Sequence, residues 1–170
     1  MITASFNWFQ LWLILHILGV LVAFGPTFAF GLIAALGQKN PQHAGFAVEI
    51  MHTIERRMTI PIAVIVPLLG TALIYTAHFD LWKSEWLLIS IVLYTIAFFF
   101  AVFVQNKNGA RLLGLMKQMP PGPPPPGAQP PAEVMALGKK LQMGGIFLTV
   151  MVVIILVLMV WRPGSCQGIC

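Results

Sequence analysis

The sequence predicts an all-α membrane protein that folds as a four-helix transmembrane bundle. Of its 170 residues, 58% are hydrophobic and only 9% are charged, whereas soluble domains carry about 25% charged residues. The mean hydropathy is +0.86. Four apolar stretches are each long enough to cross a hydrocarbon core of roughly 30 Å, which takes about 20 helical residues. Because lipid offers backbone groups no water to bond, each stretch must be helical.

The predicted spans follow one another within a single membrane domain, residues 1–170. They cover residues 11–36, 60–77, 86–104 and 144–161. The first span contains Gly25 and Pro26, and Pro67 lies in the second. We expect both spans to bend there, because proline removes a backbone hydrogen bond and clashes with the preceding turn.

Small residues recur every four positions along the first span, which predicts a face that another helix approaches closely. They are Gly19, Ala23, Thr27, Gly31 and Ala35. His16 lies three residues before Gly19 on the same stripe. We therefore expect the His16 side chain to point into the bundle.

The basic residues predict the orientation of the bundle. Eight of them follow the first and third spans: Lys39, Arg56, Arg57, Lys107, Arg111, Lys117, Lys139 and Lys140. The opposite side has only Lys83 and Arg162. This asymmetry predicts a multi-pass protein of the bacterial inner membrane, with both long loops in the cytoplasm and both termini outside. All five tryptophans lie near the outer ends of spans, as in an interfacial aromatic belt.

The two long loops differ in character. Residues 41–58 are amphipathic and are expected to extend the second helix into the cytoplasm. Residues 120–131 form a proline-rich cytoplasmic linker, predicted to be a stiff polyproline segment. Neither loop contains a basic helix or a basic patch interleaved with aromatic residues. The lipid bilayer, rather than nucleic acid, is therefore the expected partner.

His16 is the first candidate site residue, because an ionisable side chain deep in a membrane span marks a functional site by default. Three roles stay open. It is a neutral histidine hydrogen-bonded to a neighbouring helix, a ligand of haem b or a metal, or part of a proton-relay or quinone site. His78, at the end of the second span, is a weaker candidate for a second haem ligand, because the two histidines differ by about 10 Å in depth at 1.5 Å per residue.

Two further groups lie outside the spans. Glu49, His52 and Arg56 share one helical face at i, i+3 and i+7. Such a polar cluster either binds an anionic substrate, relays protons or is a solvated face with internal ion pairs. Cys166 and Cys170 close the chain and are candidates for a disulfide or a soft-metal site such as Cu(I). No nucleotide-binding loop, zinc-protease motif or covalent haem-attachment motif occurs.

Several stretches resemble a bacterial family of four-span membrane proteins, domain of unknown function family 2269, which is grouped with the copper-resistance D proteins. The resemblance rests on LHILGVLVAFG around His16, LLGTALIY at the end of the second span, SEWLLISIVLY and the terminal LMVWRPG. The same grouping is similar to the haem-dependent protoporphyrinogen oxidases of bacteria, whose first-span histidine corresponds to His16. Ala23 stands where those oxidases usually have tryptophan.

Three functions follow as hypotheses. The first is a small accessory or subunit-like membrane protein that binds haem b or copper through His16. It would act beside other membrane subunits or a second copy of itself. The second is a haem-dependent membrane oxidoreductase, with the Glu49–His52–Arg56 face as substrate entrance. The third is a copper-handling protein that uses Cys166, Cys170 and nearby methionines.

Overall fold

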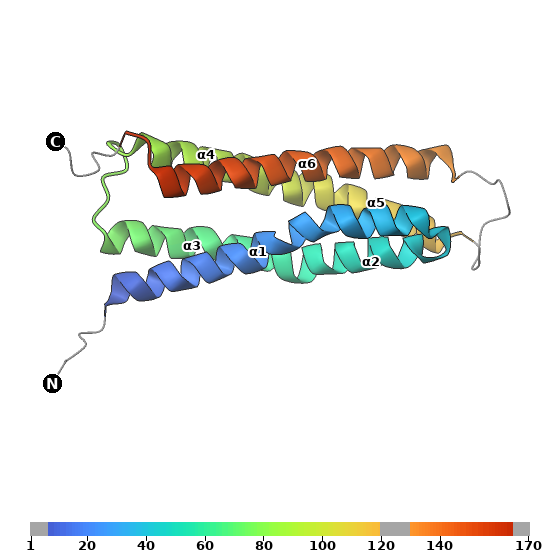
Figure 1. The fold of residues 1–170 in the computed structure, drawn as a ribbon, viewed down its shortest axis with the longest axis horizontal. Coiled ribbons are helices and arrows are strands. Elements are labelled where there is room, and N and C mark those ends of the chain that lie inside the picture. The colour runs from blue at the N-terminus through green and yellow to red at the C-terminus, as the bar shows by residue number, and fades with distance from the viewer. Residues whose placement is uncertain (1–6, 120–129, 165–170) are drawn as a thin grey trace.

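The computed structural model describes residues 7–119 and 130–164, and these residues form helices without any strand. The elements are α1 (Trp8–Lys39), the 3₁₀ turn η1 (Pro41–His43), α2 (Ala44–Ile54), the π-helical turn η2 (Glu55–Thr59), α3 (Ile60–Thr76), α4 (Glu85–Phe100), the π-helical turn η3 (Ala101–Gln105), α5 (Asn106–Lys117) and α6 (Ala132–Trp161). Since η2 joins α2 to α3 and η3 joins α4 to α5 without a break, the described parts contain four long helices (Figure 1).

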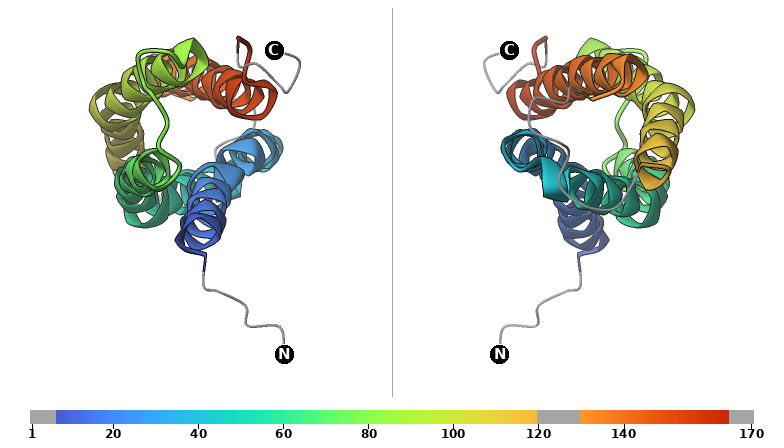
Figure 2. Two further views of the ribbon diagram at one scale, coloured as in Figure 1. Left: turned by 90° about the vertical axis from the view of Figure 1, so that its left-hand side faces the viewer. Right: turned by 90° about the vertical axis from the view of Figure 1, so that its right-hand side faces the viewer.

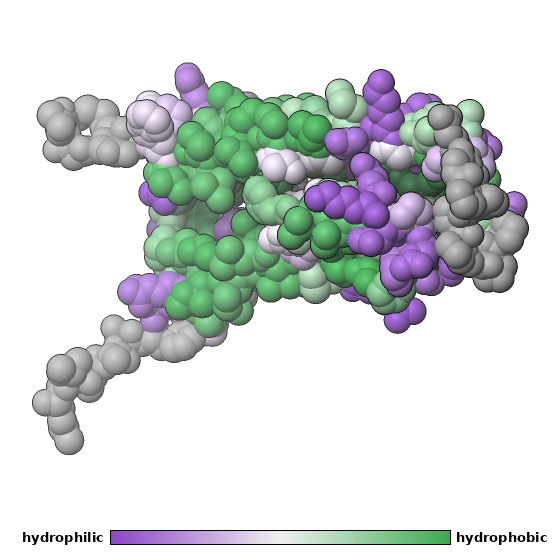
Figure 3. Space-filling view, turned by 45° about the vertical axis from the view of Figure 1, so that its right-hand side comes forward, coloured by the Kyte–Doolittle hydropathy of each residue, from purple (hydrophilic) through white to green (hydrophobic). Residues whose placement is uncertain are grey.

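Each of these four helices is long and apolar enough to cross a membrane, which confirms the four-span prediction. The helices extend well beyond the apolar stretches. For example, α1 has 32 residues, which gives a length of about 48 Å, compared with roughly 30 Å for the hydrocarbon core. The extension lies at one end of the bundle, which holds α2, α5 and the start of α6. We call it the polar end. Figure 3 shows hydrophilic residues gathered there, whereas apolar residues cover most of the rest.

The opposite end, which we call the tryptophan end, holds the start of α1, the α3–α4 connection and the end of α6. Trp8 stacks on Trp12 with ring centroids 6.4 Å apart, and Trp82 and Trp161 are exposed. Trp86 differs, because it is only 5% exposed and lies beneath the Arg162 guanidinium. All five tryptophans therefore lie at this end of the bundle, and Trp86 among them is a core residue.

The helices form two pairs. In one pair α1 packs along α2 and α3, and in the other α6 packs along α4 and α5. The pairs meet at the polar end, where α2 packs against α5, and also through contacts between α1 and α6. Figure 1 shows the pairs standing apart toward the tryptophan end, and Figure 2 shows the helices as a ring around an open centre.

Small residues set the spacing between α1 and α3. A Cβ atom on Gly19 would lie 3.1 Å from Cγ2 of Val66, and Ala23 is fully buried. The predicted small-residue face is therefore correct for these two residues. It is wrong for Gly31, where a Cβ atom would meet nothing within 4 Å. The contacting face of α1 changes between Ala23 and Gly31, and Pro26 lies in this interval.

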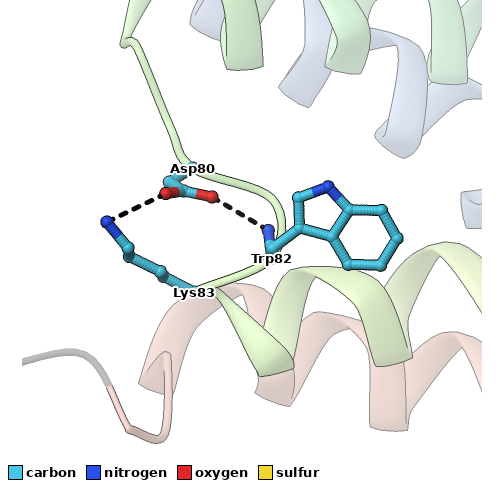
Figure 4. A network of polar contacts seen from close by, with 3 residues as sticks. All are labelled: Asp80, Trp82 and Lys83. Atoms are coloured by element: carbon cyan, nitrogen blue, oxygen red, sulfur yellow. Dashed lines mark hydrogen bonds and ion pairs between the residues drawn. The ribbon is translucent and has the colours of Figure 1, made fainter.

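The α3–α4 connection is a tight turn. His78 has a positive φ of 53°, and the Phe79 amide donates to the Ile74 carbonyl at 3.1 Å, which ends α3 in a Schellman arrangement. Asp80 then accepts from the Trp82 amide at 3.1 Å and pairs with Lys83 at 3.2 Å (Figure 4). The hydrogen bond from Lys83 holds the pKa of the Asp80 carboxyl below its usual value.

Two adjacent glycines in α6 give a matched test of the packing within the second pair. Gln105 donates from Nε2 to the Leu141 carbonyl at 2.9 Å. A Cβ atom on Gly144 would clash with the Gln105 amide and lie 3.3 Å from Phe100, whereas one on Gly145 would be 3.9 Å from Gln105. Gly144→Ala should therefore lower the free energy of unfolding by about 1–3 kcal/mol, and Gly145→Ala should leave it nearly unchanged. Equal unfolding curves in mixed detergent micelles would contradict this packing.

Candidate functional site

A cavity of about 2170 Å³ runs between the two helix pairs and is lined by residues from all four long helices. Its lining is mainly apolar over the middle of the bundle and toward the tryptophan end, with residues such as Phe24, Phe28, Val66, Ile91 and Leu148. Figure 3 shows the molecule hollowed between its upper and lower layers. Ligand pockets usually measure about 300–1,000 Å³. This cavity is therefore large enough for a bulky apolar ligand.

His16 lines this cavity and is fixed against α3. Its Nδ1 lies 3.1 Å from the Val66 carbonyl oxygen. Because a carbonyl only accepts hydrogen bonds, we assign the proton to Nδ1, which leaves the lone pair on Nε2. Nε2 has no hydrogen-bond partner among the described residues. The hydrogen-bonded histidine considered from the sequence is thus present, and its second ring nitrogen is available to a ligand.

Glycine at position 70 makes room for this imidazole. A Cβ atom there would lie 3.3 Å from Cε1 of His16 and 3.7 Å from its Nδ1. Any larger residue would push the ring away from α3. The orientation of the His16 ring is therefore set by two residues of α3, through the Val66 carbonyl and the bare backbone of Gly70.

Pro67 creates a second polar feature next to His16. Proline has no N–H to donate to the carbonyl four residues earlier, so the Ala63 carbonyl loses its helical partner. The Tyr94 hydroxyl on α4 donates to this carbonyl instead. Tyr94 also contacts Phe24 of α1 edge to face, with centroids 6.2 Å apart. The bond joins the two helix pairs across the cavity.

His78 is not brought near His16. It is exposed, occupies the left-handed position that ends α3 and does not line the cavity. Val66, which marks the level of His16, lies twelve residues earlier in the same helix, a distance of about 18 Å along the axis. In the structure, the role of His78 is to end α3 in the left-handed backbone conformation.

The three residues of the predicted polar cluster point in different directions. Glu49 forms an exposed ion pair with Lys117 of α5 at 2.9 Å, and Arg56 is exposed. His52 instead lines the cavity. Only one of the three residues therefore faces the interior, and Glu49 serves to tie α2 to α5.

The positions of the other predicted ligands are not described by the structure. Cys166 and Cys170 lie outside the described residues, as does most of the proline-rich linker. Within the described residues no three His, Cys, Asp or Glu side chains gather closely enough to hold a metal ion.

A family model described as a predicted integral membrane protein, DUF2269, matches residues 10–163. The chain belongs to this family. No curated protein and no solved structure matches the chain. The DUF2269 match begins near the start of α1 and ends just after α6, so it includes all four spans and both ends of the cavity.

In this DUF2269 protein, Glu55 and Thr59 line the cavity beside His52. The sequence placed Glu55 only alongside the polar cluster, and it gave no indication of Thr59. We call these three residues the His52 cluster. His52 and Glu55 face Gly109 of α5, where a Cβ atom would lie 3.3 Å from Nδ1 of His52 and 3.8 Å from Oε2 of Glu55. The His52 cluster has a spacing of i, i+3 and i+7, which is as regular as that of Glu49, His52 and Arg56. The helical pattern of the sequence therefore fits both sets equally well, and it does not show which set faces the interior.

Proposed function

We propose that the protein holds haem b in its interior cavity, where Nε2 of His16 would bind the iron, and serves as an accessory membrane subunit. The observation that carries this proposal is the His16 ring, whose Nδ1 is bound to the Val66 carbonyl. Histidines that ligate metals usually donate their other ring nitrogen to a carbonyl or carboxylate, which fixes the ring and its tautomer. His16 has this arrangement within an apolar cavity.

A porphyrin fits these residues better than a bare metal ion. A bare copper or zinc ion needs several protein ligands, and no group of three ionisable ligands occurs in the described part of the chain. Haem iron takes four ligands from its own macrocycle, so one histidine suffices on the protein side. A single well-oriented imidazole is therefore a suitable haem ligand.

The walls of the cavity also suit a large planar molecule with an anionic edge. Aromatic and aliphatic side chains cover its middle. Arg162 lines it at the tryptophan end, 5.5 Å from the Trp86 ring centroid. A guanidinium pairs well with a carboxylate such as a haem propionate.

In this proposal the residues of the chain bind and orient, and they exclude water. His16 presents a neutral nitrogen, Gly70 and Val66 fix its ring, and Tyr94 holds the helix pairs at a constant separation. Bound haem would supply one-electron redox chemistry. An accessory role is favoured over an oxidoreductase because Glu49 and Arg56 lie away from the cavity, so the expected substrate entrance is not formed by that face. The basic residues support a bacterial inner-membrane location with the polar end in the cytoplasm.

Titration of the detergent-purified protein with haemin tests the proposal. The wild-type chain should bind about one equivalent and develop a Soret band. His16→Ala should weaken binding at least tenfold, because the iron loses its protein ligand. Imidazole added to the His16→Ala variant should restore the ligand and part of the Soret signal.

Two histidine variants serve as matched controls. His78→Ala and His43→Ala both remove an exposed imidazole and should bind haemin as the wild type does. Unchanged haemin affinity in His16→Ala, with His78→Ala also unchanged, would refute the ligand assignment.

A further inference from the structure

The cavity changes character along its length. Toward the polar end its lining includes Gln38, Gln42, Gln105 and Gln142 together with the His52 cluster. We propose that the His52 cluster binds the uncharged, hydroxyl-bearing head of an amphipathic molecule whose apolar part lies in the cavity. This site is distinct from the one proposed at His16 and does not depend on it.

Unpartnered buried atoms are the main evidence. Thr59 is only 8% exposed, lines the cavity, and its hydroxyl has no hydrogen-bond partner. Nδ1 of His52 is also buried without a partner. Buried polar groups are nearly always hydrogen-bonded, and each one left unpaired is unfavourable. Two such groups in one wall of a cavity therefore indicate a ligand that bonds to them.

The charges select the kind of head group. The Glu55 carboxylate is half-buried and makes no hydrogen bond or ion pair with a described residue. Burial raises the pKa of this carboxyl to about 7, so near neutral pH it carries only part of its charge. The ionised form repels an anionic head, and it accepts a strong hydrogen bond from a hydroxyl. Of the cations near His52, Lys117 pairs with Glu49 and Arg56 is exposed. Lys139 of α6 lines the polar end of the cavity, so the test below includes an anionic competitor. An uncharged donor is thus the best match for the His52 cluster.

The backbone lets α5 approach the His52 cluster closely. Glu55–Thr59 form a π-helical turn, a feature that often occurs at functional sites because it widens the helix. On the facing helix Gly109 is buried and lacks a side chain, so Nδ1 of His52 and Oε2 of Glu55 both come within 4 Å of its Cβ position. His52 and Glu55 therefore pack directly against the bare backbone of Gly109, and a head group would reach the His52 cluster from the cavity.

The location also suits an amphipathic ligand. Thr59 directly precedes the apolar helix α3, so the His52 cluster lies where the lipid-facing part of the bundle ends. Thr59 and Glu55 lie about 10 Å and 17 Å from the level of His16, because seven and eleven residues separate them from Val66. One molecule can therefore occupy the polar end while His16 is separately liganded.

Equilibrium binding of two probes to the full chain in detergent tests this inference. Decylubiquinol carries phenolic hydroxyls, and dioctanoylglycerol carries an alcohol, so the tighter binder identifies the source of the head group. At least one probe should bind saturably. Thr59→Val and Glu55→Gln should each weaken that binding at least tenfold. Gly109→Ala, which places a methyl group beside His52, should weaken it too, whereas Gly114→Ala on the same helix should not, because a Cβ atom there meets nothing within 4 Å.

A stability measurement separates ligand binding from a structural role. Without the probe, Thr59→Val should raise the melting temperature, because it removes a buried hydroxyl that has no partner. Haemin binding should be unchanged in this variant, so the outcome is independent of the His16 proposal. The inference is overturned if neither probe binds saturably, if the variants bind the probes as the wild type does, or if phosphatidylglycerol competes as well as the uncharged probes.

Discussion

Ala23→Leu is expected to lower the free energy of unfolding by about 3 kcal/mol and to reduce the yield of folded protein. Ala23 is fully buried where α1 packs along α3. Three extra carbon atoms would force the two helices apart in a contact that is close because its residues are small. The pair that carries His16 and Val66 would then lose its spacing.

Gly31→Leu serves as the matched control, because it adds an even larger group on the same predicted stripe. A Cβ atom at Gly31 meets nothing within 4 Å, so we expect this variant to unfold as the wild type does. Both are measured by unfolding in mixed detergent micelles. Equal loss of stability in the two variants would show that the contact extends along the whole stripe, contrary to the structure.

Tyr94→Phe is expected to lower the free energy of unfolding by about 2 kcal/mol. The phenyl ring keeps the contact with Phe24, and only the hydroxyl is removed. The Ala63 carbonyl would then have no donor, since Pro67 has no N–H. An unpaired carbonyl inside an apolar bundle is the source of the predicted loss.

Pro67→Ala should reduce that loss when combined with Tyr94→Phe, because alanine restores a backbone N–H four residues after Ala63. We predict a coupling energy of about 1–2 kcal/mol between the two sites in a double-mutant cycle. Additive effects of Pro67→Ala and Tyr94→Phe would mean that the tyrosine bond does not replace the missing helical bond.

The number and positions of the spans could be predicted from the sequence because the hydrocarbon layer imposes a simple rule on helix length. The same rule does not apply beyond the membrane. The extension by α2 was predicted from its amphipathic pattern, whereas the polar helix α5 was missed because its residues have no apolar run. The described helices are therefore longer than the spans that the sequence defined.

The site could be predicted only in part, because its hydrogen bonds join side chains of one helix to backbone carbonyls of another. The depth of His16 and its position beside Gly19 predicted an inward-facing ring, and the structure confirms this. Its acceptor is a carbonyl of α3, and a carbonyl has no signature in the sequence. The Tyr94 bond likewise depends on a carbonyl that Pro67 leaves without a donor, and on which helix faces it.

The His52 cluster illustrates a second limit. The choice between its members and the Glu49–His52–Arg56 set depends on the rotation of α2 about its axis. The π-helical turn at Glu55–Thr59 changes this rotation, because it inserts an extra residue into the helical repeat. Gly109 then allows another helix to approach His52 and Glu55 closely, which the sequence of α2 does not specify.

Pulsed electron paramagnetic resonance of the haemin-loaded protein tests directly whether His16 is the haem ligand. Selective nitrogen-15 labelling of histidine at Nε2 distinguishes the two ring nitrogens. Because Nδ1 of His16 is bound to the Val66 carbonyl, we predict that the iron couples strongly to a labelled Nε2 nitrogen and that His16→Ala abolishes this coupling. Strong coupling that persists in His16→Ala, or the absence of any coupling to histidine nitrogen, would contradict the assignment of His16 as the haem ligand.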